Sequence, residues 1–590
     1  MIKTLIFKTY FYPIFLCILV MVQFVLMIHG FDVNDEGFSL TFYQQFFNAP
    51  QSVEYCFVYW LSGLVGGLWY LLFEDGGILW FRVLTIVFNT ATFMMCYSIL
   101  KPHMSRAYIL LGLTMVLFVN DFGFLAFYHN HLTAFLAILS VYVLIEGLHK
   151  TNLWLLGFSG LILGVNIFSR LPNITLLIFV LVIPYGYIIL RKKHVKTCIT
   201  PIVTMLLGVV LGIMLVIGLM KSLHQWEIME NAFKVLFSLG KTDDSGHNII
   251  TLIRVIKNNY VAIVYEGCKL MLLIFTLLGL YKILKYNKIR KVVVPMIALI
   301  LFVVLFAKGD IYIIYVFGLL GCLGVLLTTQ KTEGIKMIAF LALLIMIFLP
   351  LGSGGGVHSS GYICIWLAIP FFFQFLSQIM TVRMSTEIAS KTYTCSIDNQ
   401  LVKPLFVIIA MSYFGYKGYS MSQQAYFDKG NRLVKTATIN NKFAKGIYTT
   451  RERADIINDV LQELEKHVQP DDYLFVYDSA PMLHFLTQTR PYPYNPWVWI
   501  YDHVSFEAKI YTAENEIEVL PIVVQQKFTT IWEFSEPMDD YLAENRQMSN
   551  TYHPGRAIAM NQFLDRHDYK IIWSNAHFNI YKSKIDLATK

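Results

Sequence analysis

The chain has little charge and lacks the motifs of common soluble enzymes. Only 15% of its 590 residues are charged, whereas 56% are hydrophobic. It has no Walker loop, no HExxH zinc motif, no dinucleotide-binding glycine fingerprint after a strand and no GxSxG nucleophile elbow. These absences argue against the soluble nucleotide-dependent, metalloprotease and α/β-hydrolase classes.

Cysteine is also scarce and scattered. All eight cysteines precede residue 400, and no pair of them has the spacing of a metal-binding motif. We therefore expect neither a disulfide framework nor a zinc site, and we interpret the cysteines as small buried hydrophobic residues.

Long apolar runs fill the first two thirds of the chain. A helix that crosses a bilayer needs roughly 20 mainly apolar residues, and about thirteen such segments occur between residues 10 and 420. The stretch 57–73 is long enough to be a fourteenth span. The composition therefore predicts a polytopic α-helical membrane protein, with one segment whose placement decides the topology.

The distribution of lysine and arginine predicts that topology, because short cytoplasmic loops carry the excess positive charge. If 57–73 lies on or dips into the membrane surface, the strongest basic loops fall on the cytoplasmic side; they contain Arg191, Lys192, Lys193, Lys196, Lys282, Lys285, Lys288, Arg290 and Lys291. The loop 220–260 is the exception. We therefore expect a multi-pass protein of the inner (plasma) membrane, with loop 30–56 and tail 421–590 on the periplasmic, extracytoplasmic face.

The sequence of the polar tail predicts a compact α/β domain. It holds 18 Lys and Arg against 22 Asp and Glu, so the basic excess belongs to the membrane part and is no sign of nucleic-acid binding. We expect a transmembrane catalytic domain over 1–420, with an outer loop and surface helices at 30–76, and a periplasmic domain over 421–590. The tail elements that we expect are a helix at 451–467, strands at 473–477 and 530–534, and a hairpin of 570–573 with 578–581.

An acidic cluster opens the first outer loop. Asp32, Asp35 and Glu36 lie within five residues at the mouth of the first span, where like charges repel and partial desolvation raises carboxyl pKa values. A site that needs a base or an anchor for a cation would tolerate that cost. The ordinary alternative is that Asp35 and Glu36 cap the helix that begins near Phe38.

Further polar residues gather at the same predicted face. His129 and His131 follow the third span, Arg170 ends the fifth, and Lys308 joins the ninth and tenth. An arginine at an outer helix end opposes the positive-inside bias, so Arg170 is a candidate phosphate ligand, with a salt bridge as the alternative. For the histidines the alternative is a hydrogen-bonded loop. The glycine-rich stretch 352–356 is either a flexible loop or a backbone cradle for phosphate or sugar.

This pattern resembles the GT-C superfamily of membrane glycosyltransferases. The resemblance lies in a single span followed by the Asp35-Glu36 pair, surface-seeking helices, the span that begins Phe81-Arg82-Val83-Leu84, and the Gly160…Gly164…Ser169-Arg170 run. The layout is similar to that of the lipid A aminoarabinose transferase and the bacterial protein O-mannosyltransferases, which use dolichyl- or polyprenyl-phosphate sugars. The tail looks like those of uncharacterised bacterial members.

The resemblance implies an inverting transfer of a hexosyl or pentosyl group from a polyprenyl-phosphate donor to an extracytoplasmic lipid, glycan or protein acceptor. It implies Asp35 as the base, Glu36 as its neighbour and Asp32 as the substitute. If the acceptor is a phosphate, Asp35 would instead orient the substrate or hold a divalent cation, the one cofactor left open; no metal ligand is assigned. The expected substrate-binding residues are Arg170, Arg82, His129, His131, Lys308, Arg254 and Lys257.

Three other functions fit parts of the pattern. A transporter, including a flippase for lipid-linked sugars, is the runner-up, although transporters place ionisable residues near the midplane and show repeated halves. A polysaccharide polymerase or ligase would share the donor chemistry without the same need for Asp35. A noncatalytic scaffold is the third.

Overall fold

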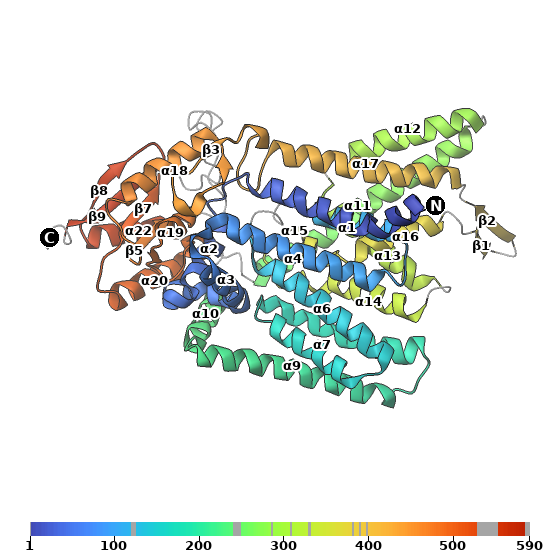
Figure 1. The fold of residues 1–590 in the computed structure, drawn as a ribbon, viewed down its shortest axis with the longest axis horizontal. Coiled ribbons are helices and arrows are strands. Elements are labelled where there is room, and N and C mark those ends of the chain that lie inside the picture. Colours follow the sequence, from blue (N-terminus) through green and yellow to red (C-terminus); the bar gives the residue numbers. More distant parts are fainter. Residues whose placement is uncertain are drawn as a thin grey trace.

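The structure is a computed structural model of the 590-residue chain. The residues that it describes are 2–119, 126–239, 249–284, 287–306, 309–328, 332–379, 383–388, 391–396, 399–527 and 553–584. Figure 1 shows an elongated molecule in which a bundle of long helices meets a smaller domain of helices and strands at one end.

The bundle uses most of the chain up to residue 423. Its α-helices are α1 (Ile2–Met27), α4 (Gly77–Leu100), α5 (Arg106–Leu117), α6 (His129–Lys150), α7 (Leu153–Asn166), α8 (Val182–Pro184), α9 (Lys196–Ser222), α11 (Ile249–Ile283), α12 (Asn287–Phe306), α13 (Ile311–Leu327), α14 (Glu333–Phe348), α15 (Gly356–Cys364), α16 (Ala368–Ile379) and α17 (Asn399–Gln423). The 3₁₀-helix η4 (Leu171–Leu181) and the π-helix η5 (Tyr185–Leu190) extend α8, and a hairpin of β1 (Arg383–Ile388) and β2 (Lys391–Ser396) precedes α17.

Many apolar side chains on the outside of the bundle are exposed, as a lipid-facing surface requires. On α9 these include Ile199, Leu207, Leu211 and Met214. By length and composition, six helical segments of the described chain can cross a membrane, or seven if α15 and α16 form one bent span. Five further apolar helices of 10–17 residues overlap other expected spans. The architecture is thus that of a multi-pass helical membrane protein, and the expected number of about thirteen spans is not confirmed.

Four helices lie at the end of the bundle beside the tail: α2 (Asp35–Asn48), the 3₁₀-helix η1 (Pro50–Tyr59), α3 (Trp60–Leu72) and α10 (Trp226–Ser238). Although Pro50–Leu72 is one of the six segments, its α-helical part has 13 residues, about 20 Å, which is shorter than a hydrocarbon core of about 30 Å. Gly63 and Gly66 let α3 pack directly on aromatic residues of α2. This position is consistent with the expectation that 57–73 lies on or dips into the membrane surface.

Glycines bring α7 and α9 into backbone contact. A Cβ on Gly160 would lie 1.9 Å from the carbonyl oxygen of Met205, and a Cβ on Gly208 would lie 1.9 Å from that of Gly157. Each helix carries the small-residue spacing typical of closely packed membrane helices. This packing fixes the end of α7, from which the chain leads to Arg170.

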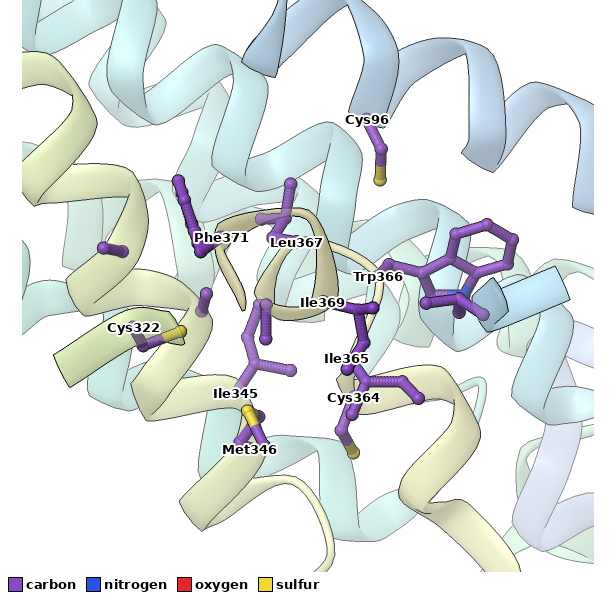
Figure 2. Close-up of a cluster of buried hydrophobic side chains, with 14 of the residues drawn as sticks. Cys96, Cys322, Ile345, Met346, Cys364, Ile365, Trp366, Leu367, Ile369 and Phe371 are labelled. Atoms are coloured by element: carbon purple, nitrogen blue, oxygen red, sulfur yellow. The ribbon is translucent and has the colours of Figure 1, made fainter. Parts of the chain in front are cut away.

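A break of three residues separates α15 from α16, and the two helices are bent by 71°. Figure 2 shows Ile365, Trp366 and Leu367 at this break, surrounded by Cys322, Ile345 and Met346 of neighbouring helices. The side chains of the break are buried, so the apolar core holds the bend. The bend lets α15 end inside the bundle, while its first residues lie next to the glycine-rich stretch.

The cysteines match the expectation only in part. Cys56, Cys96, Cys198, Cys322 and Cys364 are buried and free. Cys17 on α1 and Cys268 on α11 are exposed, so the prediction that all are buried is wrong for these two. Their helices face outward, where a small apolar side chain meets the same kind of surroundings as in the core.

The tail is an α/β domain, as expected. Its five-stranded sheet has the order β6 (Arg490–Pro491), β5 (Tyr473–Tyr477), β7 (Ile522–Gln526), β9 (Phe578–Ser583) and β8 (Tyr569–Ser574); β5 is parallel to β6 and β7, and β9 is antiparallel to β7 and β8. Leu474 lies opposite Ile522, and Val523 opposite Tyr581. The other elements are η7 (Arg432–Val434), β3 (Ala437–Thr438), η8 (Lys442–Ala444), β4 (Tyr448–Thr449), α18 (Arg451–Leu464), α19 (Met482–Thr487), η9 (Val498–Ile500), α20 (His503–Glu516) and α22 (Pro554–Arg566).

The predicted helix, first strand and hairpin of the tail are confirmed as α18, β5 and β8–β9. The expected strand 530–534 lies outside the described residues. The boundary near 420 stays a prediction, because the outer loop and the tail share a core: Leu40, Phe42 and Phe46 of α2 belong to the same buried cluster as Leu483 and Val524. Where α2 crosses α19, a Cβ on Gly37 would lie 2.2 Å from the backbone nitrogen of Met482.

Candidate active site

The three carboxylates of the first outer loop lie where the bundle meets the tail, at the start of α2, and each has a different environment. Asp32 is buried, and its two oxygens accept hydrogen bonds from the backbone N–H groups of Asn34 (2.7 Å) and Glu36 (2.8 Å). Burial raises its pKa well above the usual range, and the charges of Asp35 and Glu36 raise it further. The capping role considered for Asp35 and Glu36 thus falls to Asp32.

Glu36 forms a buried ion pair with Arg82 of α4. Nε and Nη2 of Arg82 donate to the two carboxylate oxygens at 2.8 and 2.6 Å, and both side chains are inaccessible to solvent. Arg82 also donates to the carbonyl oxygens of Met27 and Gly30. Burial raises the pKa of Glu36, and Arg82 opposes that shift. These contacts bind the loop to α4, so they do not favour the predicted substrate contact of Arg82.

Asp35 is half-buried and contacts a tyrosine from the tail. The hydroxyl of Tyr426 donates to its Oδ2 at 2.5 Å. Burial raises the pKa of Asp35 to about 6, although the bond from Tyr426 favours the ionised form. In the part of the chain that the structure describes, Oδ1 has no hydrogen-bond partner. Asp35 is therefore the carboxylate of the cluster that keeps an oxygen available to a substrate.

Arg170 is a buried cation without a paired carboxylate in the described residues. Its side chain is 5% exposed, Nη1 donates to Oδ1 of Asn130 at 3.3 Å, and Nη2 donates to the carbonyl oxygen of Leu349 at 3.0 Å. Nε has no partner among the described residues. Because an uncompensated buried charge is costly, this arrangement suits an anionic ligand.

Two tyrosines connect the acidic and cationic sides. Tyr59 of η1 and Tyr128 at the start of α6 each interact electrostatically with both Asp35 and Arg170. The ring of His129 stacks on that of Tyr59 at 4.2 Å and meets that of Tyr128 edge-on at 4.2 Å. Asp35, Arg170 and His129 thus each interact with the same two tyrosines, and a common site for the three stays a prediction.

His131 contacts Tyr128 in a different way, with its ring edge-on to that of Tyr128 at 5.9 Å. Its Nδ1 accepts a hydrogen bond from the backbone N–H of Tyr128 at 3.2 Å and helps to cap α6. The side chain is buried, Nε2 has no partner among the described residues, and it lines a small cavity with Asn89, Thr92 and Trp366. The contacts thus agree with the hydrogen-bonded alternative for His131 and with a site position for His129.

The glycine-rich stretch lies beside the cationic side. Gly352 (φ +84°) packs on Pro172, next to Arg170, and Gly356 (φ +55°) packs on Asn259 of α11. Oδ1 of Asn259 accepts hydrogen bonds from the Tyr312 hydroxyl at 3.1 Å and from the His358 N–H at 3.2 Å. These contacts fix the turn.

The other predicted cations are less well placed. Arg254 and Lys257 are exposed on α11, on either side of Val255, which faces Gly356. Lys308 lies outside the described residues. Substrate contacts of all three stay predictions.

Within the described residues, no group of three or more His, Cys, Asp and Glu side chains could hold a metal ion. Both oxygens of Asp32 accept hydrogen bonds from backbone N–H groups, and both oxygens of Glu36 accept hydrogen bonds from Arg82. The described residues thus gather no donor set for a divalent cation, the cation stays a prediction, and no step below uses one.

Sequence reasoning missed Tyr426, Tyr128 and Tyr59. Tyr426 is 391 residues from Asp35 in the chain, and no local pattern joins two positions so far apart. Tyr128 directly precedes the predicted histidines, and its place at a helix start is the only signal that could have drawn attention to it.

Comparisons with known proteins found structural similarity only. No protein-family model and no curated protein matches the sequence. The chain is similar to the structure of the Archaeoglobus fulgidus oligosaccharyltransferase in complex with zinc and sulfate, with a TM-score of 0.45 and 11% identity over 87% of this chain and 68% of that one. It is also similar to ArnT from Cupriavidus metallidurans bound to undecaprenyl phosphate, with a TM-score of 0.39 and 11% identity over 97% of this chain and 98% of that one.

Proposed function

We propose that this protein is an inverting membrane glycosyltransferase that moves a sugar from a polyprenyl-phosphate donor to a hydroxyl of an extracytoplasmic lipid, glycan or protein. One observation carries the proposal. Asp35, whose Oδ1 has no partner among the described residues, and Arg170, a buried cation without a carboxylate partner there, both interact with Tyr59 and Tyr128.

The two residues suit the two charges that develop in this reaction. The carboxylate of Asp35 takes the proton of the acceptor hydroxyl, and the acceptor oxygen then attacks the anomeric carbon. The bond from that carbon to the phosphate oxygen breaks, and its electron pair leaves with the polyprenyl phosphate. A positioned base contributes about 10²–10⁴-fold to such a step.

Arg170 stabilises the departing phosphate. Its planar guanidinium can present Nε and one Nη hydrogen to phosphate oxygens in a bidentate geometry, and Nε has no other partner among the described residues. His129, which stacks on Tyr59 and meets Tyr128 edge-on, lies close enough to Arg170 to feel its charge. In this proposal Asp32, Glu36 and Arg82 hold the loop and do not contact the substrate.

The orientation is proposed from charge bias: site and tail lie on the periplasmic side of the inner membrane. The tail contains no cysteine, so a Ser574→Cys variant introduces the one cysteine of the tail at an exposed position of β8, and labelling of the wild type, which has exposed Cys17 and Cys268, gives the background. A membrane-impermeant maleimide is expected to label this cysteine in intact spheroplasts. Labelling only after lysis would place the tail in the cytoplasm and refute the orientation.

The enzymatic proposal is tested with undecaprenyl-phosphate-linked hexoses and pentoses carrying a radiolabel in the sugar. Membranes with the wild type are expected to release undecaprenyl phosphate and label an acceptor. Asp35→Asn should lower transfer about 10²–10⁴-fold at equal expression, while Glu74→Gln, a solvent-exposed carboxylate near the same membrane face, should leave it unchanged.

The remaining outcomes separate the alternatives. Wild-type activity that Asp35→Asn retains would move the base to Asp32 or indicate a phosphate acceptor. A wild type that moves the labelled lipid across vesicles without cleaving it would indicate a flippase and refute the transferase.

A further inference from the structure

We propose that the tail completes the catalytic site, with Tyr426 acting as the positioning residue for Asp35. This inference rests on the proposed function, because it assumes that Asp35 acts in the transfer. Three sets of contacts between the tail and the first outer loop support it.

The first contact is the hydrogen bond from Tyr426 to Asp35, held by a tight turn. Two backbone hydrogen bonds join Ala425 and Asp428, and Phe427 within the turn has φ +47°. A left-handed conformation of a phenylalanine is strained and persists only where its surroundings impose it. The turn therefore fixes the direction in which Tyr426 leaves the backbone.

The second set is a buried ion cluster at the end of the same turn. Asp428 pairs with Lys435 at 2.7 Å and with Arg453 at 3.5 Å, and all three side chains are inaccessible to solvent. Oδ2 of Asp428 accepts the backbone N–H of Phe31 at 2.9 Å, and Nη1 of Arg453 donates to the Phe31 carbonyl oxygen at 2.6 Å. Both backbone groups of Phe31, the residue before Asp32, are thus bound by the tail.

The third set joins backbones along the whole segment that leads to the acidic cluster. Tyr448 donates its N–H to the carbonyl oxygen of Ile28 at 2.8 Å and accepts the N–H of Gly30 at 2.8 Å. Met482 donates its N–H to the carbonyl oxygen of Val33 at 3.1 Å. The loop from Ile28 to Val33 therefore takes its conformation from the tail.

Several titratable groups face Asp35 besides Tyr426. They are Asp32 and Glu36 of its own loop, Tyr59 of η1 and Tyr128 ahead of α6, with Arg82 bonded to Glu36 and Arg170 near both tyrosines. Among them Tyr426 is the group that donates a hydrogen bond to the Asp35 carboxylate. Its removal should disfavour the ionised carboxylate and so raise the pKa of Asp35.

The test compares Tyr426→Phe with Tyr419→Phe in the full-length protein. Tyr419 is 64% exposed on α17, near Tyr426 in sequence, and is the matched control. With the undecaprenyl-phosphate sugar that the wild type uses best, Tyr426→Phe should move the acidic limb of the pH profile up by about one unit, and so lower kcat about twofold at pH 7 and about tenfold at pH 5, with little change in KM. Tyr419→Phe should change neither quantity.

Two results would overturn the inference. Unchanged kinetics in Tyr426→Phe would show that the contact does not matter. A lower kcat with an unchanged acidic limb of the pH profile would show that Tyr426 supports the fold but does not influence the protonation of Asp35.

A second measurement keeps the inference separate from the proposed function. Thermal unfolding is compared for the wild type, Tyr426→Phe, Asp35→Ala and the double variant. The double variant should lose less stability than the sum of the single losses, because both single changes break the same bond. Additive losses would refute the contact even if transfer is observed, whereas coupled losses without any transfer by the wild type would refute only the proposed function.

Discussion

Asp35 and Arg170 are the two charged groups of the proposed site, but different parts of the chain hold them. The acidic side is built across the junction: Tyr426, Asp428, Tyr448 and Arg453 of the tail bind the loop that carries Asp35. The cationic side is built within the bundle, where Arg170 is bonded to Asn130 and to the carbonyl oxygen of Leu349.

The two residues differ in how the surrounding protein compensates their charges. Asp35 receives a hydrogen bond that stabilises its charge, whereas the charge of Arg170 is left without an acidic partner among the described residues. The charge of Asp35 thus has a hydrogen-bond donor before any substrate binds. In the proposed function, the charge of Arg170 is balanced when an anion binds. Changes on the acidic side should therefore alter stability and pH dependence, and changes on the cationic side should mainly alter donor binding.

The largest effect is expected from breaking the ion cluster. Asp428→Ala leaves Lys435 and Arg453 buried without their shared partner, which should cost about 3–5 kcal/mol of unfolding free energy. Asp75→Ala, which removes the carboxylate of an exposed pair with Lys442, should change stability little. Thermal and denaturant unfolding measure both. Equal small losses would show that the tail does not hold the acidic loop.

On the cationic side, Arg170→Gln should weaken binding of the polyprenyl-phosphate donor about 10–100-fold, because charge-assisted hydrogen bonds to the phosphate are lost. The loss should appear in binding of undecaprenyl phosphate as well as in transfer. Arg191→Gln, which breaks a pair with Glu333 on the other predicted membrane side, is the control. Undiminished lipid binding in Arg170→Gln would remove the phosphate role.

The packing that fixes the end of α7 can be tested separately. Gly160→Ala places a methyl group against the carbonyl oxygen of Met205 and should cost about 1–3 kcal/mol through overpacking. Gly218→Ala in α9 meets nothing within 4 Å and should be neutral or slightly stabilising. If the two variants have the same unfolding midpoint, the close approach of α7 and α9 is wrong.

The smallest expected effect is the dependence on pH. Asp35 must be ionised to act as a base, so transfer should fall about tenfold per pH unit below its pKa of about 6. The sign for stability is opposite: because the folded pKa exceeds the unfolded value, the stabilising contribution of protonated Asp35 is lost as pH rises from about 4 to 6. Asp35→Asn should lack that decline in a pH series of unfolding midpoints. A wild-type rate that stays constant down to pH 5 would contradict the assignment.

The sequence predicted most of the regular elements but not the division of roles within the acidic cluster. Helix α18 and the β8–β9 hairpin were predictable because their apolar residues repeat with the period of a helix or a strand. Strand β7 was missed, since only its first three residues are apolar. The number of membrane spans was not predictable, because α15 and α16 are separated by a break and helices such as α5 are short.

Asp32, Asp35 and Glu36 were predictable as a group because charges at a helix mouth are costly. Their separate roles depend on partners distant in the chain: Arg82 lies 46 residues from Glu36, and Tyr426 lies 391 residues from Asp35. No single sequence reveals such pairs.

The bonds between Phe31, Asp428 and Arg453 also set an order of events during biosynthesis. Phe31 and Asp428 are 397 residues apart, and a ribosome adds residues N-terminal first. The acidic loop emerges early, yet the backbone of Phe31 finds its partners only after Arg453 has been made and has reached the same face of the membrane. The nascent protein therefore carries an unfinished acidic side through more than two thirds of its synthesis, and under the proposed function a chain that stalls before the tail should not transfer sugar.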